Sequence, residues 1–415
     1  MVAVSWTMTA LSLTGWKWNL PLLVLAGAAE CFALRAAIGA GQPAQEEPLP
    51  ARQLTRLEWI AVGVSAASVA VSAAAAFSAS ATSPDLLLFW GSKAQAFAAA
   101  RTIDDNFLGE PFLRFLHTSY PPLVTNAYAF ATIVAGRMSW MAAIATYPLL
   151  LAAIAIALPA ILEKAVPRRD ALVATAFVTA SLALAGDALD MAGNADAALL
   201  FFEILAVALL LGRGRDEPPA QLLAGLLLAG AAAAKVEGLP FVIAAAGFLF
   251  IRPGRRAART AAAAARILLP SALSLGVWFA YGRRYFLFRG YESYGPTLDV
   301  HLSRLGAVLV EILEAFWRSG AALPWLLPLA ALAWTARGSD LRKAAYPLAI
   351  AGTLSIFFVF TYLHGAPDPS LWITWSAGRI FLVVAVLLVL GVTAERAPGV
   401  VESATGGATL RTTGS

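Results

Sequence analysis

Residues 139–162 read SWMAAIATYPLLLAAIAIALPAIL and contain no charged side chain. The hydrocarbon core of a bilayer is crossed by an α-helix of about 20 apolar residues. This run therefore predicts a membrane-spanning helix, and comparable runs recur along the chain with short charged clusters between them. We expect about eleven spans, near residues 19–40, 58–81, 139–162, 171–187, 195–212, 220–234, 239–251, 265–282, 321–336, 344–362 and 377–394.

The composition of the whole chain supports the same fold class. Of 415 residues, 60% are hydrophobic and 13% are charged, which leaves too little polar surface to cover a water-soluble globule of this length. The apolar runs are continuous and rich in Ala and Leu, a pattern that favours helices over alternating strands. We predict an all-α, polytopic transmembrane helical bundle over residues 1–400, followed by a disordered cytoplasmic tail at 401–415.

Fourteen of the 30 basic residues form clusters in alternate loops between the predicted spans of this chain, whose net charge is +5. The clusters are Arg52 with Arg56, Lys164 with Arg168 and Arg169, Arg213 with Arg215, the arginines between 252 and 259, and Arg337 with Arg342 and Lys343. Because cytoplasmic loops carry an excess of Lys and Arg, we expect a multi-pass protein of the plasma (inner) membrane, with its N-terminus outside and its C-terminus inside. Arg283, Arg284 and Arg289 depart from this pattern, since they fall in an outer loop. Loop arginines that orient helices imply no nucleic-acid partner.

Two outer segments, 82–138 and 283–320, are long enough to hold chemistry. The first should contain a helix that opens at Ser83-Pro84-Asp85 and runs to Arg101, and a second helix that starts at Tyr120-Pro121-Pro122-Leu123. In the second segment, residues 299–318 place a charged stripe along an otherwise apolar helix, which predicts a helix lying in the membrane interface.

The predicted spans 220–234 and 239–251 form an unusually short pair. Fifteen helical residues reach only about 22 Å, less than the hydrocarbon thickness. Lys235 and Glu237 at the tip of this hairpin should therefore lie below the outer lipid surface and face a polar cavity.

Ionisable groups at membrane depth are costly and call for a partner or a function. Asp85, with Trp90 and Lys93, is either a carboxylate base beside a cation or a helix start whose acid favours the helix dipole. His117 and Tyr120 precede two prolines. They are either substrate contacts or residues that only mark the start of a helix.

Two further clusters lie in later outer loops. Asp187, Asp190, Asn194 and Asp196 form either a substrate site or a solvated turn with a helix cap at Asn194. Asp368 and Ser370 are followed by Trp372, Trp375 and Arg379. We expect Arg379 at the start of the final helix, where it either clamps a phosphate or snorkels to the interface beside an aromatic belt.

Some ionisable residues do not point to a site. Glu30 and Glu203 lie inside spans, where interhelical contacts explain them. The three histidines, His117, His301 and His364, include no pair at ligand spacing, so we expect no metal site.

Taken in order, these clusters resemble the GT-C superfamily of lipid-phosphate-dependent glycosyltransferases, in the branch that holds protein O-mannosyltransferases and aminoarabinose transferases. That branch carries an Asp after an early span, a Pro-Pro-Leu helix, an Asp before a later span, a Lys-Gly or Glu-Gly hairpin tip, and an Arg opening a late helix. The matching positions are Asp85, Tyr120 to Leu123, Asp196, Lys235 to Gly238, and Arg379.

The resemblance implies roles for these residues. Asp85 would be the catalytic base, and Arg379 together with Lys93 would bind the donor phosphate. The substrate pocket would be lined by His117, Tyr120, Asp196, Lys235 and Glu237. The reaction would be an inverting transfer of a sugar from a polyprenyl-phosphate donor to an extracytoplasmic lipid, glycan or protein acceptor, without a cofactor.

The chain departs from the pattern of the families that it resembles at several points. Tyr120 stands where the aminoarabinose branch has Lys, and Leu86 follows Asp85 where protein mannosyltransferases have a second acid. The oligosaccharyltransferase signature Trp-Trp-Asp-Tyr-Gly is missing, and we expect no soluble domain after the last span, which disfavours transfer of a large preassembled glycan to protein. Two other classes remain open: a secondary transporter and a non-catalytic membrane scaffold subunit.

Overall fold

A computed structural model describes residues 1–39, 53–78, 83–110, 116–184, 191–211, 217–250, 257–285, 300–318, 341–364 and 369–395. Within these ranges every regular element is a helix. Several positions of interest in the sequence lie outside the described residues: the predicted span 321–336, the tail 401–415, Asp187, Asp190, Arg289 and Asp368.

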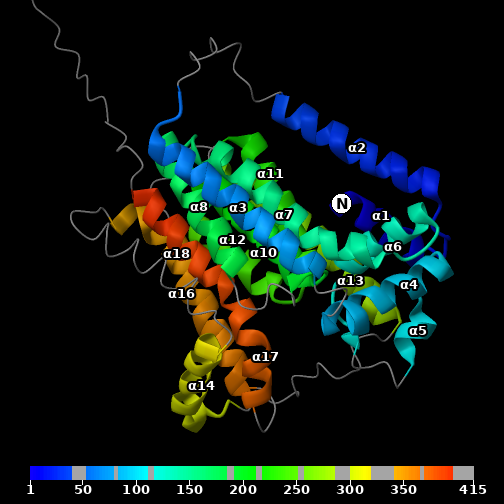
Figure 1. The fold of residues 1–415 in the computed structure, drawn as a ribbon. Coiled ribbons are helices and arrows are strands. Elements are labelled where there is room, and N and C mark those ends of the chain that lie inside the picture. Colours follow the sequence, from blue (N-terminus) through cyan, green and yellow to red (C-terminus); the bar gives the residue numbers. More distant parts are fainter. Residues whose placement is uncertain are drawn as a thin grey trace, which may run out of the picture.

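The helices follow one another along the chain (Figure 1) as α1 (Val2–Leu13), α2 (Leu20–Gly39), α3 (Arg56–Ser78), the π-helix η1 (Asp85–Trp90), α4 (Gly91–Ala100), α5 (Asp105–Gly109), α6 (Leu123–Ala135), α7 (Trp140–Leu162), α8 (Arg168–Leu184), α10 (Ala195–Leu211), α11 (Pro218–Ala234), α12 (Gly238–Phe250), α13 (Ala257–Arg284), the 3-10 turn η4 (Leu302–Arg304), α14 (Leu305–Arg318), α16 (Leu341–His364), α17 (Ser370–Ile380) and α18 (Leu382–Glu395).

Five helical stretches in the described part of the chain are long and apolar enough to cross a membrane. They are Arg56–Ser78, Trp140–Leu162, Ala261–Arg284, Ala345–His364 and Ser370–Ala394. This is the architecture of a helical membrane protein. The number of about eleven spans stays a prediction.

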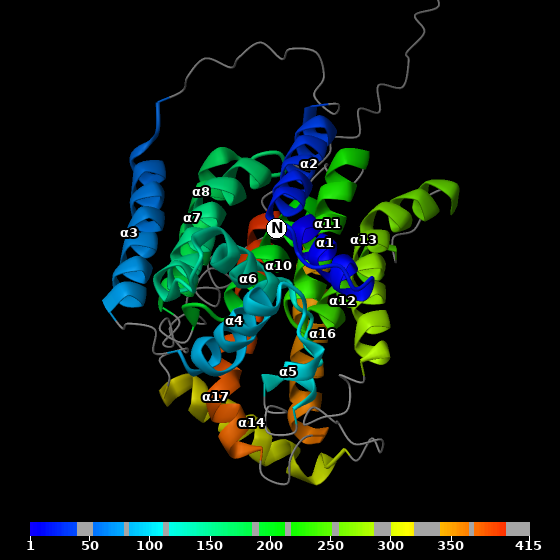
Figure 2. The same ribbon diagram turned by 90° about the vertical axis from the view of Figure 1, so that its right-hand side faces the viewer.

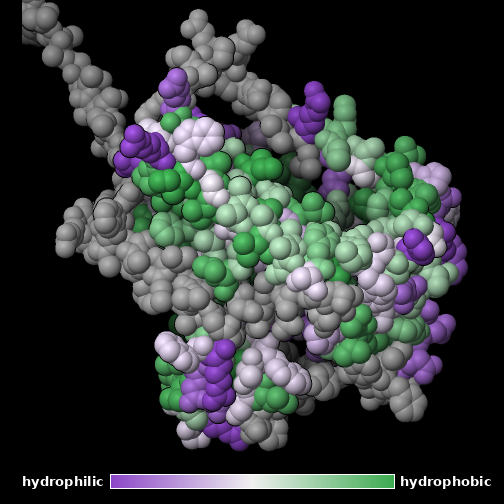
Figure 3. All heavy atoms as spheres, viewed as in Figure 1, coloured by the Kyte–Doolittle hydropathy of each residue, from purple (hydrophilic) through white to green (hydrophobic). Residues whose placement is uncertain are grey.

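The surface of the bundle carries large apolar side chains. Phe32, Ile156 and Ile356 are each about three-quarters exposed, at 76%, 76% and 74%. Figure 3 shows apolar residues covering the middle of one face, with hydrophilic residues toward its margins. Lipid is the solvent that such a surface fits.

Small residues let the helices approach one another closely. A Cβ atom added to Gly225 of α11 would collide with the carbonyl oxygen of Arg266 in α13, and one added to Gly230 would meet the ring of Phe202 in α10. These glycines therefore bring α11 against both neighbours, and α11 ends at the candidate site.

The long helices run in a common direction in Figure 2, and α4, α5, α14 and α17 gather at one end of them. There α14 lies across the direction of α16 and packs on α17. It buries Val308, Ile312 and Ala315 and exposes Leu313 and Trp317. The helix predicted at 299–318 is thus present as η4 and α14, with its apolar outer face.

Two elements differ from the predictions. The helix α1 was not predicted, and its 12 residues are too few to cross a bilayer. The last predicted span, 377–394, begins earlier, because the chain is already helical from Ser370. Its α-helical hydrogen-bond pattern is interrupted at Phe381, between α17 and α18.

Candidate active site

The first turns after Ser83 form a π-helix, whereas the sequence predicted an α-helix. The N–H of Gly91 bonds to the carbonyl of Leu86, five residues back. Gly91 packs so closely on Trp140 that a Cβ atom there would collide with the indole ring. This contact depends on tertiary packing, and π-turns recur at functional sites. Asp85 is the first residue of the element.

Asp85 and Arg379 meet although 294 positions separate them. The Nη1 atom of Arg379 donates to Oδ2 of Asp85 over 2.7 Å. The amide Nδ2 of Asn194 donates to the same oxygen over 2.6 Å. Both donors therefore hold one oxygen of the carboxylate, and among the described residues Oδ1 of Asp85 receives no hydrogen bond.

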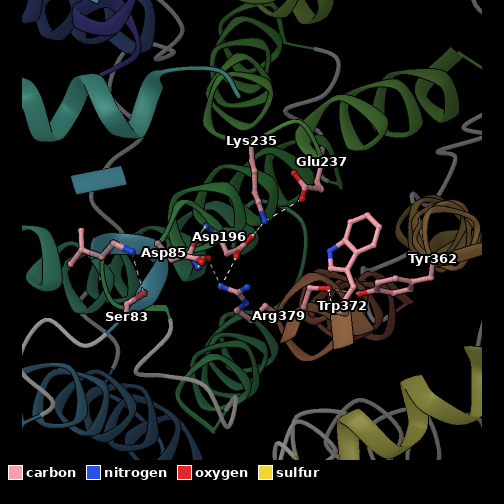
Figure 4. A network of polar contacts seen from close by, with 11 residues as sticks. Ser83, Asp85, Asp196, Lys235, Glu237, Tyr362, Trp372 and Arg379 are labelled. Atoms are coloured by element: carbon pink, nitrogen blue, oxygen red, sulfur yellow. Dashed lines mark hydrogen bonds and ion pairs between the residues drawn. The ribbon is translucent and has the colours of Figure 1, made fainter. Parts of the chain in front are cut away.

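The contacts continue from Arg379 into a chain of alternating charges, visible in Figure 4. Arg379 Nη1 lies 3.5 Å from Oδ2 of Asp196, whose Oδ1 accepts a hydrogen bond of 2.8 Å from Lys235 Nζ. Lys235 Nζ also lies 3.2 Å from Oε1 of Glu237. We call Asp85, Arg379, Asp196, Lys235 and Glu237 the ion network.

Exposure differs along the ion network. The side chain of Asp196 is 3% exposed, whereas those of Asp85 and Glu237, at the two ends, are 23% and 22% exposed. The centre of the network is therefore held inside the protein, its two end carboxylates are its most exposed members, and Arg379, beside Asp85, keeps 13% exposure.

A tight turn between α11 and α12 positions Lys235. The N–H of Gly238 bonds to the carbonyl of Lys235 over 3.1 Å, and a Cβ atom on Gly238 would collide with the backbone of Ala231. Burial disfavours the charged ammonium, but the carboxylates of Asp196 and Glu237 outweigh burial and hold the pKa of Lys235 above its usual range. Lys235 is thus a fixed positive charge.

Arg379 lies in the last turn of α17, not at the start of the final helix as the sequence predicted. The cation therefore sits near the negative end of the α17 dipole. Three residues before Arg379 on α17, Ser376 Oγ lies 2.7 Å from Tyr362 OH and donates to the carbonyl of Trp372. Figure 4 shows Tyr362 and Trp372 beside Arg379, so they flank the ion network from α16 and α17.

The other three predicted site residues belong to a second group. Lys93 Nζ lies 4.5 Å from the ring centroid of Trp90 and donates to the carbonyl oxygen of His117 over 3.3 Å. The His117 ring stacks on Tyr120 at 4.7 Å and meets Phe89 edge-on at 4.9 Å. We call Phe89, Trp90, Lys93, His117 and Tyr120 the aromatic cluster. Lys93 is thus a buried cation whose contacts include one ring face and one backbone carbonyl.

No family model, curated protein or solved structure matches this chain. The resemblance to glycosyltransferases therefore depends on the order of the motifs, and the roles it implies stay predictions. In the described part of the chain, no group of three or more His, Cys, Asp or Glu side chains is placed to hold a metal ion.

Asn194 makes two contacts, and the sequence indicated only the one with the backbone of α10. The sequence left Asn194 as either part of a substrate site or a helix cap, and its Oδ1 does accept the N–H of Asp196 at the start of α10 over 3.2 Å. A cap uses only the amide oxygen of Asn194, so the N–H donors on its Nδ2 still need an acceptor. That need is the signal that could have pointed to a nearby carboxylate. Tyr362 was missed altogether, since an aromatic residue inside a span carries no such signal.

Proposed function

We propose that this protein is a membrane glycosyltransferase that moves a sugar from a polyprenyl-phosphate donor to an acceptor on the extracytoplasmic side of the plasma membrane. The observation that carries the proposal is the contact between Asp85 and Arg379. A carboxylate with one oxygen held by two donors, and the other oxygen unbonded by described residues, lies against a guanidinium. A proton acceptor and an anion-binding group thus occupy one place.

The reaction would be a single displacement at C1 of the sugar. The acceptor hydroxyl oxygen attacks C1 while Oδ1 of Asp85 takes the hydroxyl proton. The bond between C1 and the phosphate oxygen breaks, and the polyprenyl monophosphate leaves with the electron pair. A single displacement inverts the anomeric centre.

Arg379 would stabilise the departing phosphate. A guanidinium carries five N–H donors, so it can contact a phosphate and keep a carboxylate partner. Charge stabilisation of this kind is most effective where the donor is fixed in advance. Asp196, held in turn by Lys235, supplies that fixed support.

The placement of the basic residues supports an extracytoplasmic site. Trp140 at the start of α7 packs on Gly91, directly after η1, so α7 begins at the level of the site. Its 23 residues carry the chain about 34 Å away. The cluster Lys164, Arg168 and Arg169 follows at that far end. The positive-inside rule then assigns the far end to the cytoplasm.

The interface helix α14 suits a lipid-linked donor. It lies at the same end of the bundle as α17 (Figure 2), with an exposed apolar face that includes Leu313 and Trp317. A helix of this kind lies between headgroups and acyl chains. A donor phosphate at that level could meet Arg379 while its prenyl chain stayed in hydrocarbon.

The test is transfer by purified protein in proteoliposomes, with a panel of radiolabelled prenyl-phosphate hexoses and pentoses and membrane extract as acceptor. The wild type should transfer at least one sugar. Asp85→Asn keeps the shape of the side chain and removes the base, so transfer should fall by about 10²–10⁴-fold with the protein still folded. Full transfer by Asp85→Asn would refute the role of the base.

A second candidate is a proton-coupled secondary transporter, which Glu203 favours. This carboxyl is buried in α10, seven residues after Asp196 and so on the same helix face, and its Oε2 has no hydrogen bond within the described residues. The ion network also has three carboxylates against two cations, an excess that would suit a cationic cargo. Uptake into vesicles that is lost in Glu203→Gln, with no sugar transfer by the wild type, would select this candidate.

A further inference from the structure

Asn194 links the backbone of α10 to the side chain of Asp85. Its side chain is buried, and its two ends make different bonds: Oδ1 accepts the N–H of Asp196 over 3.2 Å, and Nδ2 donates to Asp85 Oδ2 over 2.6 Å. Because the oxygen is committed to the helix N-terminus, the NH₂ group must face Asp85. The orientation of the amide is therefore fixed by the bond at each end.

The backbone that carries Asn194 is fixed as well. Gly193 has φ +82°, in the left-handed region, and a Cβ atom there would lie 2.6 Å from Cδ2 of Leu86. Leu86 is fully buried and follows Asp85 in η1. The turn before α10 is thus packed directly on the element that carries Asp85, which fixes the distance between the amide and the carboxylate.

Asn194 and Arg379 bond the same oxygen of Asp85, and their effects differ. Arg379 is a cation that a donor phosphate would also attract, whereas the neutral amide of Asn194 does not compete for a phosphate. When Arg379 engages the phosphate, Asn194 still holds Oδ2. The carboxylate then keeps its plane, and Oδ1 keeps its direction toward the acceptor.

We propose that Asn194 is a positioning residue, which fixes the Asp85 carboxylate so that Oδ1 accepts the proton of the acceptor hydroxyl. This inference rests on the proposed transferase function. It assigns Asn194 no contact with substrate, and its effect should appear in the rate of the chemical step with little change in donor binding.

Two substitutions separate the amide donor from the helix cap. Ser and Asp are both good N-cap residues, so Asn194→Ser and Asn194→Asp keep an acceptor for α10 and lose the donor to Asp85. In the proteoliposome assay, kcat of Asn194→Ser should fall by about 10²-fold, the scale of a misplaced catalytic group. The KM for the donor should stay near that of the wild type.

Asn194→Asp should have the stronger effect, because it puts a second carboxylate against Asp85. Like charge favours a protonated carboxyl, so the acid side of its activity profile should move to higher pH. Asn126→Ser is the matched control: Asn126 is a buried amide that donates to Ser5 Oγ over 3.0 Å, outside the ion network. It should lower thermal stability and leave kcat per folded molecule unchanged.

A second readout does not depend on sugar transfer. Carbodiimides react with protonated carboxyl groups, so mass spectrometry of carbodiimide-treated protein reports the protonation of Asp85. Asp85 should be modified faster in Asn194→Asp than in the wild type at pH 6, and Asn126→Ser should match the wild type.

The outcomes are distinguishable. If the wild type transfers no sugar but Asn194→Asp speeds the modification of Asp85, the proposed function fails and the contact between the two side chains stands. If the wild type transfers sugar, and Asn194→Ser and Asn194→Asp keep its kcat and its pH profile, the positioning role of Asn194 is overturned. A fall in kcat that only matches the loss of folded protein overturns it too.

Discussion

The ion network and the aromatic cluster each hold a cation that the resemblance assigns to the donor phosphate, but they hold it differently. Arg379 lies between two carboxylates, at 2.7 Å from Asp85 and 3.5 Å from Asp196. Lys93 lies over the ring of Trp90 and donates to a carbonyl oxygen. A carboxylate beside a cation can take a proton, whereas a ring face and a carbonyl can only hold the cation in place. The two carboxylates beside Arg379 therefore make the ion network the stronger candidate for chemistry.

The largest expected effect on stability comes from the centre of the ion network. Asp196→Asn leaves buried Lys235 with Glu237 alone, and breaking a buried pair from one side costs about 3–5 kcal/mol. The free energy of unfolding, measured by titrating mixed micelles with SDS, should fall by that amount.

Glu314→Gln is the control for this substitution. Glu314 also has a short ion pair, 2.6 Å to Arg318, but both side chains are more than half exposed, and exposed pairs contribute only about 0–1 kcal/mol. Equal losses for Asp196→Asn and Glu314→Gln would contradict the distinction between a buried network and a surface pair.

A smaller effect is expected in the aromatic cluster. Lys93→Met keeps the apolar stem and removes the charge over Trp90, so the free energy of unfolding should fall by about 1–2 kcal/mol. The KM for the polyprenyl-phosphate donor should not change. A large rise in KM with unchanged stability would instead make Lys93 a phosphate ligand, as the resemblance implies. It would contradict the distinction drawn between the ion network and the aromatic cluster.

The smallest effect concerns pH. The raised pKa of Lys235 means that its stabilising contribution is fully present below the pKa of an unfolded lysine, about 10.4, and is lost only as pH rises through the still higher folded value. The difference in unfolding free energy between the wild type and Lys235→Met should therefore stay constant from about pH 6 to 9. A difference that shrinks within that window would show that Lys235 is not held as a cation.

Much of the fold could be predicted because the length of an apolar run is a local property. The run at 139–162 is α7 almost to the residue, and the Lys235 to Gly238 turn lies between α11 and α12 as expected. The π-turn at Asp85 could not be predicted, since it adjoins tertiary packing such as that of Gly91 on Trp140, and the sequence carries no local signal for the break at Phe381.

In the candidate site, too, some features could be predicted from the sequence and others could not. Charged residues are scarce at membrane depth, so Asp85, Asp196, Lys235, Glu237 and Arg379 could be selected from the sequence, and the structure brings these five together. The i, i+3 spacing of Trp90 and Lys93 is compatible with their contact, whereas the bond from Lys93 to the carbonyl of His117, 24 positions away, could not be foreseen. The hydrogen bond from Asn194 to Asp85 could not be predicted, because a helix cap already accounts for an asparagine at that position.

The central claim is that Asp85 and Arg379 act as one unit, and a double-mutant cycle on sugar transfer tests it most directly. Rates would be compared for the wild type, Asp85→Asn, Arg379→Gln and the double variant, with Arg318→Gln as a control for loss of an exposed arginine. Groups that act together give strongly non-additive losses. The account predicts that both single variants lose most of the transfer and that the double variant is no slower than the slower single one. Losses that multiply, or an Arg379→Gln enzyme as fast as the wild type, would contradict it.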